Sequence, residues 1–322
     1  MSAPVGASGV GSTVPGSGGA GREARTATDE GGPASRPTPF GERLRAAMDA
    51  HGPVCVGIDP HPALLESWGL GVDVAGLRAF SLGVVDALGG RVAAVKPQSA
   101  FFERFGSRGV AVLEEVVAAC RDTGTLCIVD AKRGDIGSTM EGYAHAYLAE
   151  GSPLAGDAVT LSPYLGVGSL APALDLAAAS GRGAFVLALT SNPEGASVQH
   201  ARGSDGCSVA ARVVGEVAAR NAGCELGHIG SFGVVVGATV GGAVRELGVD
   251  LEGLDGPVLA PGIGAQGAGS EQVREVFGGS VDRVLASTSR AVLRHGPDAA
   301  GLRRAHRQAV EDLETVLTGT DK

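Results

Sequence analysis

Residues 126–139, LCIVDAKRGDIGST, begin as a strand and end in a cluster of charged side chains. The opening run LCIV is apolar and typical of a buried strand. Asp130, Lys132 and Asp135 follow at once, although only 19% of the chain is charged. Asp130 and Lys132 are two residues apart, so their side chains share a face if the strand continues that far. This stretch therefore predicts a strand that ends in a functional site.

Short apolar runs of this kind recur along the chain and alternate with amphipathic stretches. Eight runs read as strands: 54–59, 91–96, 126–130, 157–163, 184–190, 232–239, 257–262 and 282–287. This alternation is typical of repeated βα units. We predict an α/β fold, a (β/α)8 TIM barrel over residues 40–322, because closure leaves no strand edge exposed. An open, doubly wound sheet is the alternative.

One helix is predicted with particular detail, at 107–124. Val110, Leu113, Val117 and Cys120 recur at three- and four-residue spacing, which is the apolar stripe of an amphipathic helix. Gly124 suits its C-terminal cap. The longest interval between strands, about 191–231, exceeds one helix and is expected to carry an active-site loop.

The ends and the bulk composition limit what the chain can be. Residues 1–39 are rich in Gly, Ser, Ala, Pro and Thr, so we expect a disordered leader. The net charge of −9 and the lack of a basic run argue against nucleic acid or an anionic membrane as partner. No run is long enough to span a membrane and no secretory signal is visible, which favours a cytoplasmic protein. The five cysteines are odd in number and lack C-x-x-C spacing, so we expect reduced, mostly buried thiols.

Polar residues follow the predicted strands at the points where the apolar runs stop. They are Asp59, Lys96, Asp130 with Lys132 and Asp135, and Ser191 with Asn192. The carboxyl ends of barrel strands meet at one face, where the active sites of such barrels lie. Singly, Asp59 could cap a turn and Lys96 could extend from a strand end to solvent. Together, charges of both signs at one barrel mouth are costly to bury unless they neutralise one another around a ligand.

Two loops in the second half of the chain predict a phosphate site. LAPGIGAQG, 259–267, follows the seventh strand, and its glycines, including Gly262 and Gly264, let backbone N–H groups approach a ligand. ASTSRAV, 286–292, follows the eighth strand and places Arg290 at the start of a helix. In TIM barrels these two loops commonly bind phosphate together.

Other chemistries find less support in the sequence. The seven histidines show no H-E-x-x-H or H-x-H pattern, and lysines are interleaved with the carboxylates that could bind a divalent ion. We expect no metal. No G-x-S-x-G elbow is present, and the glycine-rich loop follows the seventh strand rather than the first, which disfavours a hydrolase or a dinucleotide-binding protein.

The chain resembles orotidine 5′-phosphate decarboxylase, and the long form of that family in particular, over about residues 40–295. DAKRGDIGST is similar to the D-x-K-x-x-D-I signature of the family. GIDP, AVKPQSAFFE, LSPYLG, LTSNPEG and APGIGAQG follow in the order of the family. The resemblance implies decarboxylation of orotidine 5′-phosphate to uridine 5′-phosphate, in pyrimidine biosynthesis, by a cytoplasmic homodimer with no cofactor.

The resemblance also implies a role for each matching residue. Lys96, Asp130, Lys132 and Asp135 would form an alternating network, with Asp135 reaching the site of the neighbouring subunit. Asp59 would contact the ribose, Ser191 and Asn192 the pyrimidine, and Gly262, Gly264, Gln266 and Arg290 the phosphate, with Thr139 added from the partner. Ser289 stands where many relatives have glycine, so the backbone contact there is less secure.

This family chemistry gives the charges a purpose. Loss of CO2 leaves a carbanion at pyrimidine C6, which fixed charges must stabilise because no cofactor accepts the electrons. Lys132, between two carboxylates, would be held as an ammonium, stabilise that carbanion and then protonate it.

Three rival functions remain. A class I aldolase also uses a barrel lysine, but as a neutral amine, which flanking carboxylates oppose. A metal-dependent enzyme acting on a sugar phosphate shares D-x-K-x-x-D. A catalytically silent barrel could bind a nucleotide through the phosphate loops alone, but it would not need the charge network.

Overall fold

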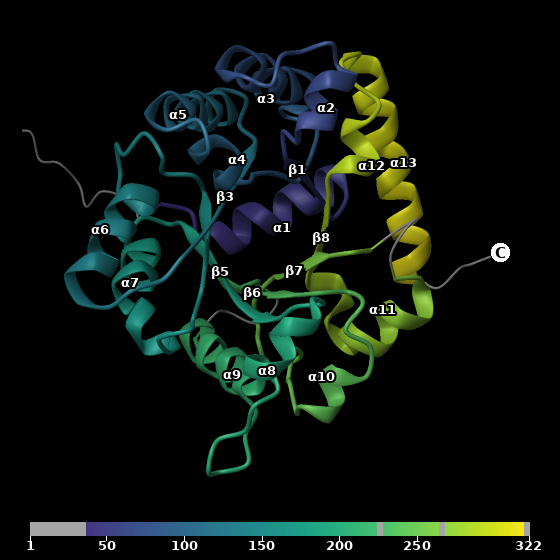
Figure 1. The fold of residues 1–322 in the computed structure, drawn as a ribbon. Coiled ribbons are helices and arrows are strands. Elements are labelled where there is room, and N and C mark those ends of the chain that lie inside the picture. Colours follow the sequence, from purple (N-terminus) through teal and green to yellow (C-terminus); the bar gives the residue numbers. More distant parts are fainter. Residues whose placement is uncertain (1–36, 224–227, 264–267, 319–322) are drawn as a thin grey trace, which may run out of the picture. The chain divides into compact units, whose positions relative to one another are not determined.

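Eight parallel strands close into a barrel in the order β1 to β8 (Figure 1). The computed structural model describes residues 37–223, 228–263 and 268–318. β1 pairs with β2 on one side and with β8 on the other, which confirms the (β/α)8 barrel and excludes the open sheet. The strands are β1 Val54–Ile58, β2 Ala94–Pro97, β3 Leu126–Arg133, β4 Ala158–Leu161, β5 Gly183–Leu189, β6 Phe232–Val236, β7 Val258–Pro261 and β8 Val284–Thr288.

The predicted strands are all present, but their ends differ from the prediction. β3 runs on to Arg133, so Asp130 and Lys132 both belong to the strand. β2 starts only at Ala94, because the N–H of Arg91 bonds the Leu88 carbonyl in the turn that ends the preceding helix. The predicted leader, 1–39, lies almost wholly outside the described residues, and its disorder stays a prediction.

Helices follow the strands around the outside of the barrel (Figure 1). The α-helices are α1 Phe40–His51, α2 Pro62–Ser67, α3 Val74–Leu88, α4 Ser99–Glu103, α5 Ser107–Asp122, α6 Gly137–Leu148, α7 Ala171–Ala179, α8 Ala196–Gln199, α9 Val209–Asn221, α10 Ala243–Glu246, α11 Ser270–Phe277, α12 Arg290–Leu293 and α13 Ala299–Thr318. Short 3-10 turns are η1 Val167–Leu170, η2 Pro193–Gly195 and η3 Gly278–Arg283. The described residues contain no helix long and apolar enough to cross a bilayer.

Helix α5 shows how well the apolar spacing predicted local structure. Leu113, Val117 and Cys120 are buried as expected, while Val110 is only half-buried. Gly124 follows the last turn with φ of 66°, the left-handed conformation that suits glycine after a helix.

Helix α1 closes the amino end of the barrel. Its residues Phe40, Leu44 and Met48 are buried against the side chains that point into the barrel from the strands. Phe40 meets the Phe185 ring edge-to-face, with 5.9 Å between the centroids. Figure 1 shows α1 across the middle of the ring of strands. The interior of the barrel is therefore a packed core that α1 covers at the amino end.

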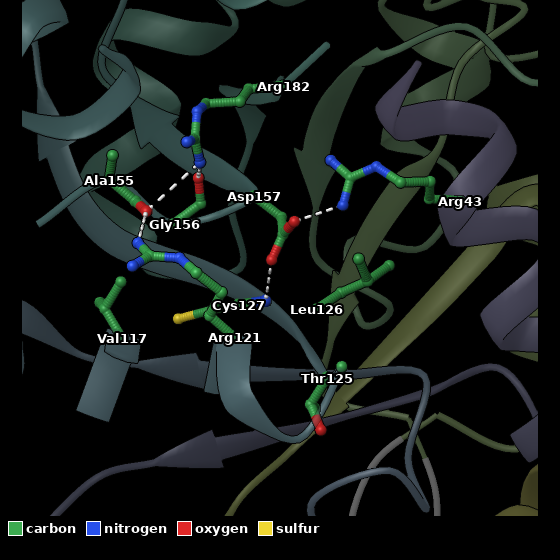
Figure 2. Close-up of a pocket in the computed structure, with 11 residues that line it drawn as sticks. Arg43, Val117, Arg121, Thr125, Leu126, Cys127, Ala155, Gly156, Asp157 and Arg182 are labelled. Atoms are coloured by element: carbon green, nitrogen blue, oxygen red, sulfur yellow. Dashed lines mark hydrogen bonds and ion pairs between the residues drawn. The ribbon is translucent and has the colours of Figure 1, made fainter. Parts of the chain in front are cut away.

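Polar contacts fix α1 to the start of β4 (Figure 2). Arg43 on α1 forms an ion pair with Asp157, whose other oxygen accepts a hydrogen bond of 2.9 Å from the Cys127 N–H. Arg182 donates to the carbonyl of Gly156 in the same loop. These guanidinium groups satisfy backbone and carboxylate oxygens at the closed end of the barrel.

The cysteines behave mostly as expected. Cys55, Cys120 and Cys127 are buried free thiols and Cys207 is half-buried and free, while Cys224 lies outside the described residues. Burial raises the pKa of the Cys55 thiol to about 12. This thiol is protonated at neutral pH and packs as a small apolar group inside the barrel.

Replacing Phe40 by alanine tests the role of α1 as the floor of the barrel. The Phe40→Ala variant should lose about 3–5 kcal/mol of unfolding free energy, because a fully buried aromatic ring leaves a cavity behind it. Denaturant unfolding measures this loss. Val72→Ala is the matched control, since Val72 is 38% exposed and its truncation should cost no more than about 0.5 kcal/mol. Equal losses in the two variants would contradict the role assigned to α1.

Candidate active site

Three charged side chains meet at the carboxyl ends of β2 and β3. Asp130 lies between two lysines: its Oδ2 is 2.6 Å from Lys96 Nζ and its Oδ1 is 2.5 Å from Lys132 Nζ. Asp130 is 7% exposed and Lys96 9%, whereas the Lys132 side chain is 42% exposed. The structure thus brings together three of the four predicted catalytic residues and leaves Lys132 accessible to a ligand.

Two neutral side chains complete the surroundings of Asp130. Thr160, on β4, donates its hydroxyl hydrogen to Asp130 Oδ1 at 2.8 Å. Gln98, with its amide nitrogen toward Asp130, donates to Oδ2 at 2.9 Å. Each carboxylate oxygen therefore accepts one charged and one neutral hydrogen bond. Neither residue was predicted from the sequence, although Gln98 lies two residues after Lys96 and Thr160 lies in the strand that follows β3.

The charge states follow from this arrangement. Burial raises the pKa of the Asp130 carboxyl, but the charges of Lys96 and Lys132 and the hydrogen bonds from both outweigh it and hold that pKa below its usual value. For Lys96, burial lowers the pKa, but the charges of Asp130 and Asp59 and the hydrogen bond to Asp130 outweigh it and raise that pKa above its usual value. At neutral pH the buried pair is fully ionised.

The backbone of β3 is distorted where these side chains leave it. The register with β4 shifts between Val129 and Arg133, which marks a bulge. Lys132 has φ of 48°, a left-handed conformation that costs free energy for a residue with a Cβ. Its N–H donates to Thr160 Oγ1 at 3.0 Å, so the same threonine stabilises the strained residue and binds Asp130. This distortion sets where the Lys132 ammonium points.

A cavity of about 620 Å³ adjoins the charged network. It is lined by residues of β2, β7 and β8 and of the segments that follow β1, β7 and β8, among them Asp59, His61, Lys96, Gly262, Ser289, Arg290 and Arg294. Arg290 is the first residue of α12, as predicted. Gly262 has φ of 90°, which a residue with a side chain adopts only with strain. Gly264 and Gln266 lie outside the described residues.

Two buried oxygen atoms in this cavity have no partner. They are Asp59 Oδ1 and Ser289 Oγ, neither of which forms a hydrogen bond with the described residues. Buried polar atoms are normally paired, so unpaired ones beside a cavity indicate a ligand position. A Cβ added at Gly57 would lie 3.1 Å from the Ser289 Cβ, which explains why glycine precedes the site in β1.

The remaining predicted residues that the structure describes form no hydrogen bond with the network within this chain. Asp135 is half-buried, and its Oδ1 accepts a hydrogen bond of 2.8 Å from the N–H of its neighbour Ile136. Thr139 is exposed in the first turn of α6. Ser191 and Asn192 follow β5 and are exposed. None of the four forms a direct hydrogen bond with Lys96, Asp130 or Lys132.

His61 and Arg294 line the cavity but were not predicted from the sequence. His61 stacks edge-on against Phe101, with ring centroids 4.3 Å apart. Arg294 follows Arg290 by four residues, which places both side chains on one face of the helical turn. That spacing was the sequence signal for a second cation near the phosphate loops. Among the described residues, no group of three His, Cys, Asp or Glu side chains is placed to hold a metal ion.

Known proteins share both the sequence and the fold. The family model described as "Orotidine 5'-phosphate decarboxylase / HUMPS family" matches residues 52–305. Orotidine 5′-phosphate decarboxylase of Streptomyces coelicolor is 58% identical over 282 residues, covering 88% of this chain and 99% of the relative. The same-named protein of Salinispora tropica is 57% identical over 281 residues, covering 87% and 99%.

Solved structures agree with this assignment. A structure from Streptomyces avermitilis superposes with a TM-score of 0.82 at 58% identity, covering 88% of this chain and 97% of that one. OMP decarboxylase of Leishmania donovani superposes with a TM-score of 0.67 at 27% identity, covering 87% and 99%. The chain therefore belongs to the orotidine 5′-phosphate decarboxylase / HUMPS family.

Proposed function

We propose that this carboxy-lyase converts orotidine 5′-phosphate to uridine 5′-phosphate without a metal or an organic cofactor. The observation that carries the proposal is the Lys96–Asp130–Lys132 network beside a cavity lined by Arg290. Relatives that are 57% and 58% identical carry the name of this activity. The geometry supplies charge at one end of the cavity and a phosphate-binding cation at the other.

The reaction needs a cation at pyrimidine C6. When the bond between C6 and the carboxylate carbon breaks, CO2 leaves and the electron pair stays on C6. The Lys132 ammonium stabilises this carbanion and then transfers a proton to C6, which gives uridine 5′-phosphate. Asp130 orients Lys132 through the 2.5 Å contact and stands near the position of the substrate carboxylate. Because the network is already hydrogen-bonded, little reorganisation is needed during the reaction.

Other groups hold the rest of the substrate. Arg290 and the glycine loop bind the 5′-phosphate, Gly264 and Gln266 included, and Asp59 Oδ1, which has no partner among the described atoms, accepts a ribose hydroxyl. Ser191 and Asn192 bind the pyrimidine. Asn192 is held near Thr190, whose hydroxyl donates to Asn192 Oδ1 at 2.7 Å. Thr139 assists at the phosphate of the partner subunit.

The same contacts argue against two rival reactions. A Schiff-base lysine must be neutral, whereas Lys132 lies 2.5 Å from a buried carboxylate, which favours the ammonium. Lys96 Nζ already lies 2.6 Å from Asp130 Oδ2. A divalent ion bound to Asp130 would therefore stand next to an ammonium group, and like charges repel strongly in such a buried position.

Removing metal ions tests the cofactor-independent mechanism. Full-length protein dialysed against EDTA should turn over orotidine 5′-phosphate at the same rate as untreated protein, because the network itself supplies the positive charge. The ultraviolet absorbance change measures the loss of substrate. If activity disappears in EDTA and returns only with Mg2+, the mechanism is wrong.

An Arg290→Ala substitution tests the phosphate site. Loss of one charged hydrogen-bonding group is worth about 1.5–3 kcal/mol, so kcat/KM for orotidine 5′-phosphate should fall by about ten- to a hundredfold. Orotidine, which lacks the phosphate, should be turned over equally poorly by variant and wild type. Arg108→Ala, at an exposed position outside the cavity, should change neither rate. An equal loss of kcat/KM on both substrates would show that Arg290 does not bind the phosphate.

We also propose that the active site is shared across a homodimer. Asp135 forms no hydrogen bond or ion pair with Lys132 within the chain, and exposed apolar side chains lie on the segments that follow β3 and β4: Ile136 is 63% exposed, Tyr164 79% and Leu165 53%. The loops after β3 and β4 touch, since the Ser162 N–H donates to the Arg133 carbonyl at 2.8 Å. An exposed apolar patch of this kind is typical of an interface.

Mixing two inactive variants tests the shared site. Lys132→Ala and Asp135→Ala subunits, exchanged into heterodimers, should recover up to about half of wild-type activity per heterodimer, since one of the two sites then receives both intact residues. Lys132→Ala mixed with Asp130→Ala is the control and should recover nothing, because both lesions affect residues of one chain's own network. Native mass spectrometry confirms that heterodimers form. No recovery in the first mixture would refute the shared site.

A further inference from the structure

A second group of basic side chains lies at the opposite end of the barrel from the catalytic network. His51 ends α1, Arg91 precedes β2, and Arg303, His306 and Arg307 lie on α13. Together with Leu88 and Gly90 they line a cavity of about 290 Å³. We call this cavity the basic pocket. It adjoins the amino ends of β1 and β2, whereas the catalytic residues follow the carboxyl ends.

The basic pocket concentrates positive charge in an acidic protein. The chain has a net charge of −9, yet no carboxylate lines this cavity. Arg91 and Arg307 are exposed, and neither forms an ion pair with a described side chain. The carboxylates Asp49, Glu311 and Glu314 line an adjoining cavity, and His51, Arg91, His306 and Arg307 line that cavity as well. Unpaired cations around one cavity favour an anionic ligand.

His306 provides an independent sign of a missing ligand. The residue is only 5% exposed, and its buried Nε2 has no hydrogen-bond partner among the described residues. Buried polar atoms are normally paired, so an unpaired one beside a cavity indicates a ligand position. Burial, reinforced by the charges of His51 and Arg307, lowers the pKa of His306 to about 4. The imidazole is therefore neutral at neutral pH and can donate one N–H to an anion without carrying a charge.

The guanidinium group of Arg303 is held in one orientation in the basic pocket. Its Nε donates to the Ala87 carbonyl at 2.9 Å, in the last turn of α3, which fixes the plane of the guanidinium. Its two terminal nitrogens form no hydrogen bond with the described residues. A planar guanidinium with free N–H groups matches the oxygens of a phosphate.

The arginines in Figure 2 differ in this respect. Arg43 is paired with Asp157, and Arg121 and Arg182 both donate to the Ala155 carbonyl. These arginines line a separate cavity, where each guanidinium group already has a carboxylate or carbonyl partner. In the basic pocket, by contrast, Arg91 and Arg307 form no ion pair with a described side chain, and His306 Nε2 has no partner among the described residues.

We propose that the basic pocket binds a phosphate dianion, either free or as the monoester group of a small metabolite. Arg91, Arg303 and Arg307 supply the charge, and His306 donates a hydrogen bond from Nε2. The site is separate from the catalytic cavity, so its occupation does not depend on the proposed reaction.

Histidine NMR of the full-length protein tests this proposal. The probe is inorganic phosphate, titrated at constant ionic strength against sodium chloride, and the His306 imidazole signals are assigned from the spectrum of His306→Gln. In the wild type these signals should shift saturably. In the double variant Arg91→Gln, Arg307→Gln, the affinity should fall at least tenfold. Both arginines are exposed, so the folded structure should persist, and each single variant should show an intermediate loss.

Two controls separate this site from general charge effects and from the catalytic cavity. Arg108→Gln with Arg274→Gln removes the same charge from exposed positions elsewhere and should leave the affinity within twofold. Arg290→Ala should leave the His306 titration unchanged. Phenyl phosphate identifies the source: binding that survives esterification indicates a phosphorylated metabolite, and binding of inorganic phosphate alone indicates the free ion.

Three results would overturn the proposal. The His306 signals could fail to respond to phosphate, respond equally to chloride, or respond equally in the Arg91→Gln, Arg307→Gln variant. None of these results bears on decarboxylation, which is measured separately on orotidine 5′-phosphate.

Discussion

The site depends on one buried carboxylate shared by two ammonium groups. Taking Asp130 out of water is unfavourable, and only the pairing with Lys96 and Lys132 makes its ionised form stable. Removing one partner of such a buried pair typically costs about 3–5 kcal/mol, because an uncompensated charge remains. Thr160 and Gln98 then fill the remaining acceptor positions of the carboxylate. The group is therefore fixed in direction as well as in charge.

The position of Lys132 beside Asp130 goes together with a distortion of strand β3. A regular β3 would keep its register with β4 and leave Lys132 with an ordinary extended backbone. Instead the register shifts after Val129, and Lys132 adopts a left-handed φ that its side chain makes unfavourable. The hydroxyl of Thr160 accepts the Lys132 N–H and donates to Asp130, so one side chain on β4 offsets part of that cost. Strain in the backbone and charge in the site are thus linked through a single residue.

The sequence could predict the barrel because its strands are buried on both faces and its helices carry an apolar stripe. Those patterns are local, and α5 and β3 follow them closely. The strand pattern also predicted that Lys96, Asp130 and Lys132 meet at one mouth of the barrel, since the alternation of side chains along a strand fixes their direction. The sequence pattern could not predict the roles of Gln98 and Thr160, because a neutral side chain contributes to the site only when the tertiary structure places it beside a buried charge. It also could not give the left-handed conformation of Lys132, which depends on the pairing with β4. Asp135 shows the other limit: a single chain contains no partner for a residue that is proposed to act across an interface.

Both ends of the barrel have buried polar atoms without a hydrogen-bond partner among the described residues. At the carboxyl end, Asp59 Oδ1 and Ser289 Oγ lack partners beside a cavity lined by arginines, and there the family relationship supplies a phosphate-bearing substrate. At the amino end, His306 Nε2 lacks a partner beside another cavity lined by arginines. Both places combine an unsatisfied polar atom with arginines that form no ion pair among the described residues, Arg290 and Arg294 at one end and Arg91 and Arg307 at the other. A chain with a net charge of −9 has carboxylates enough to pair such cations, so leaving them unpaired beside two cavities favours anion binding at both.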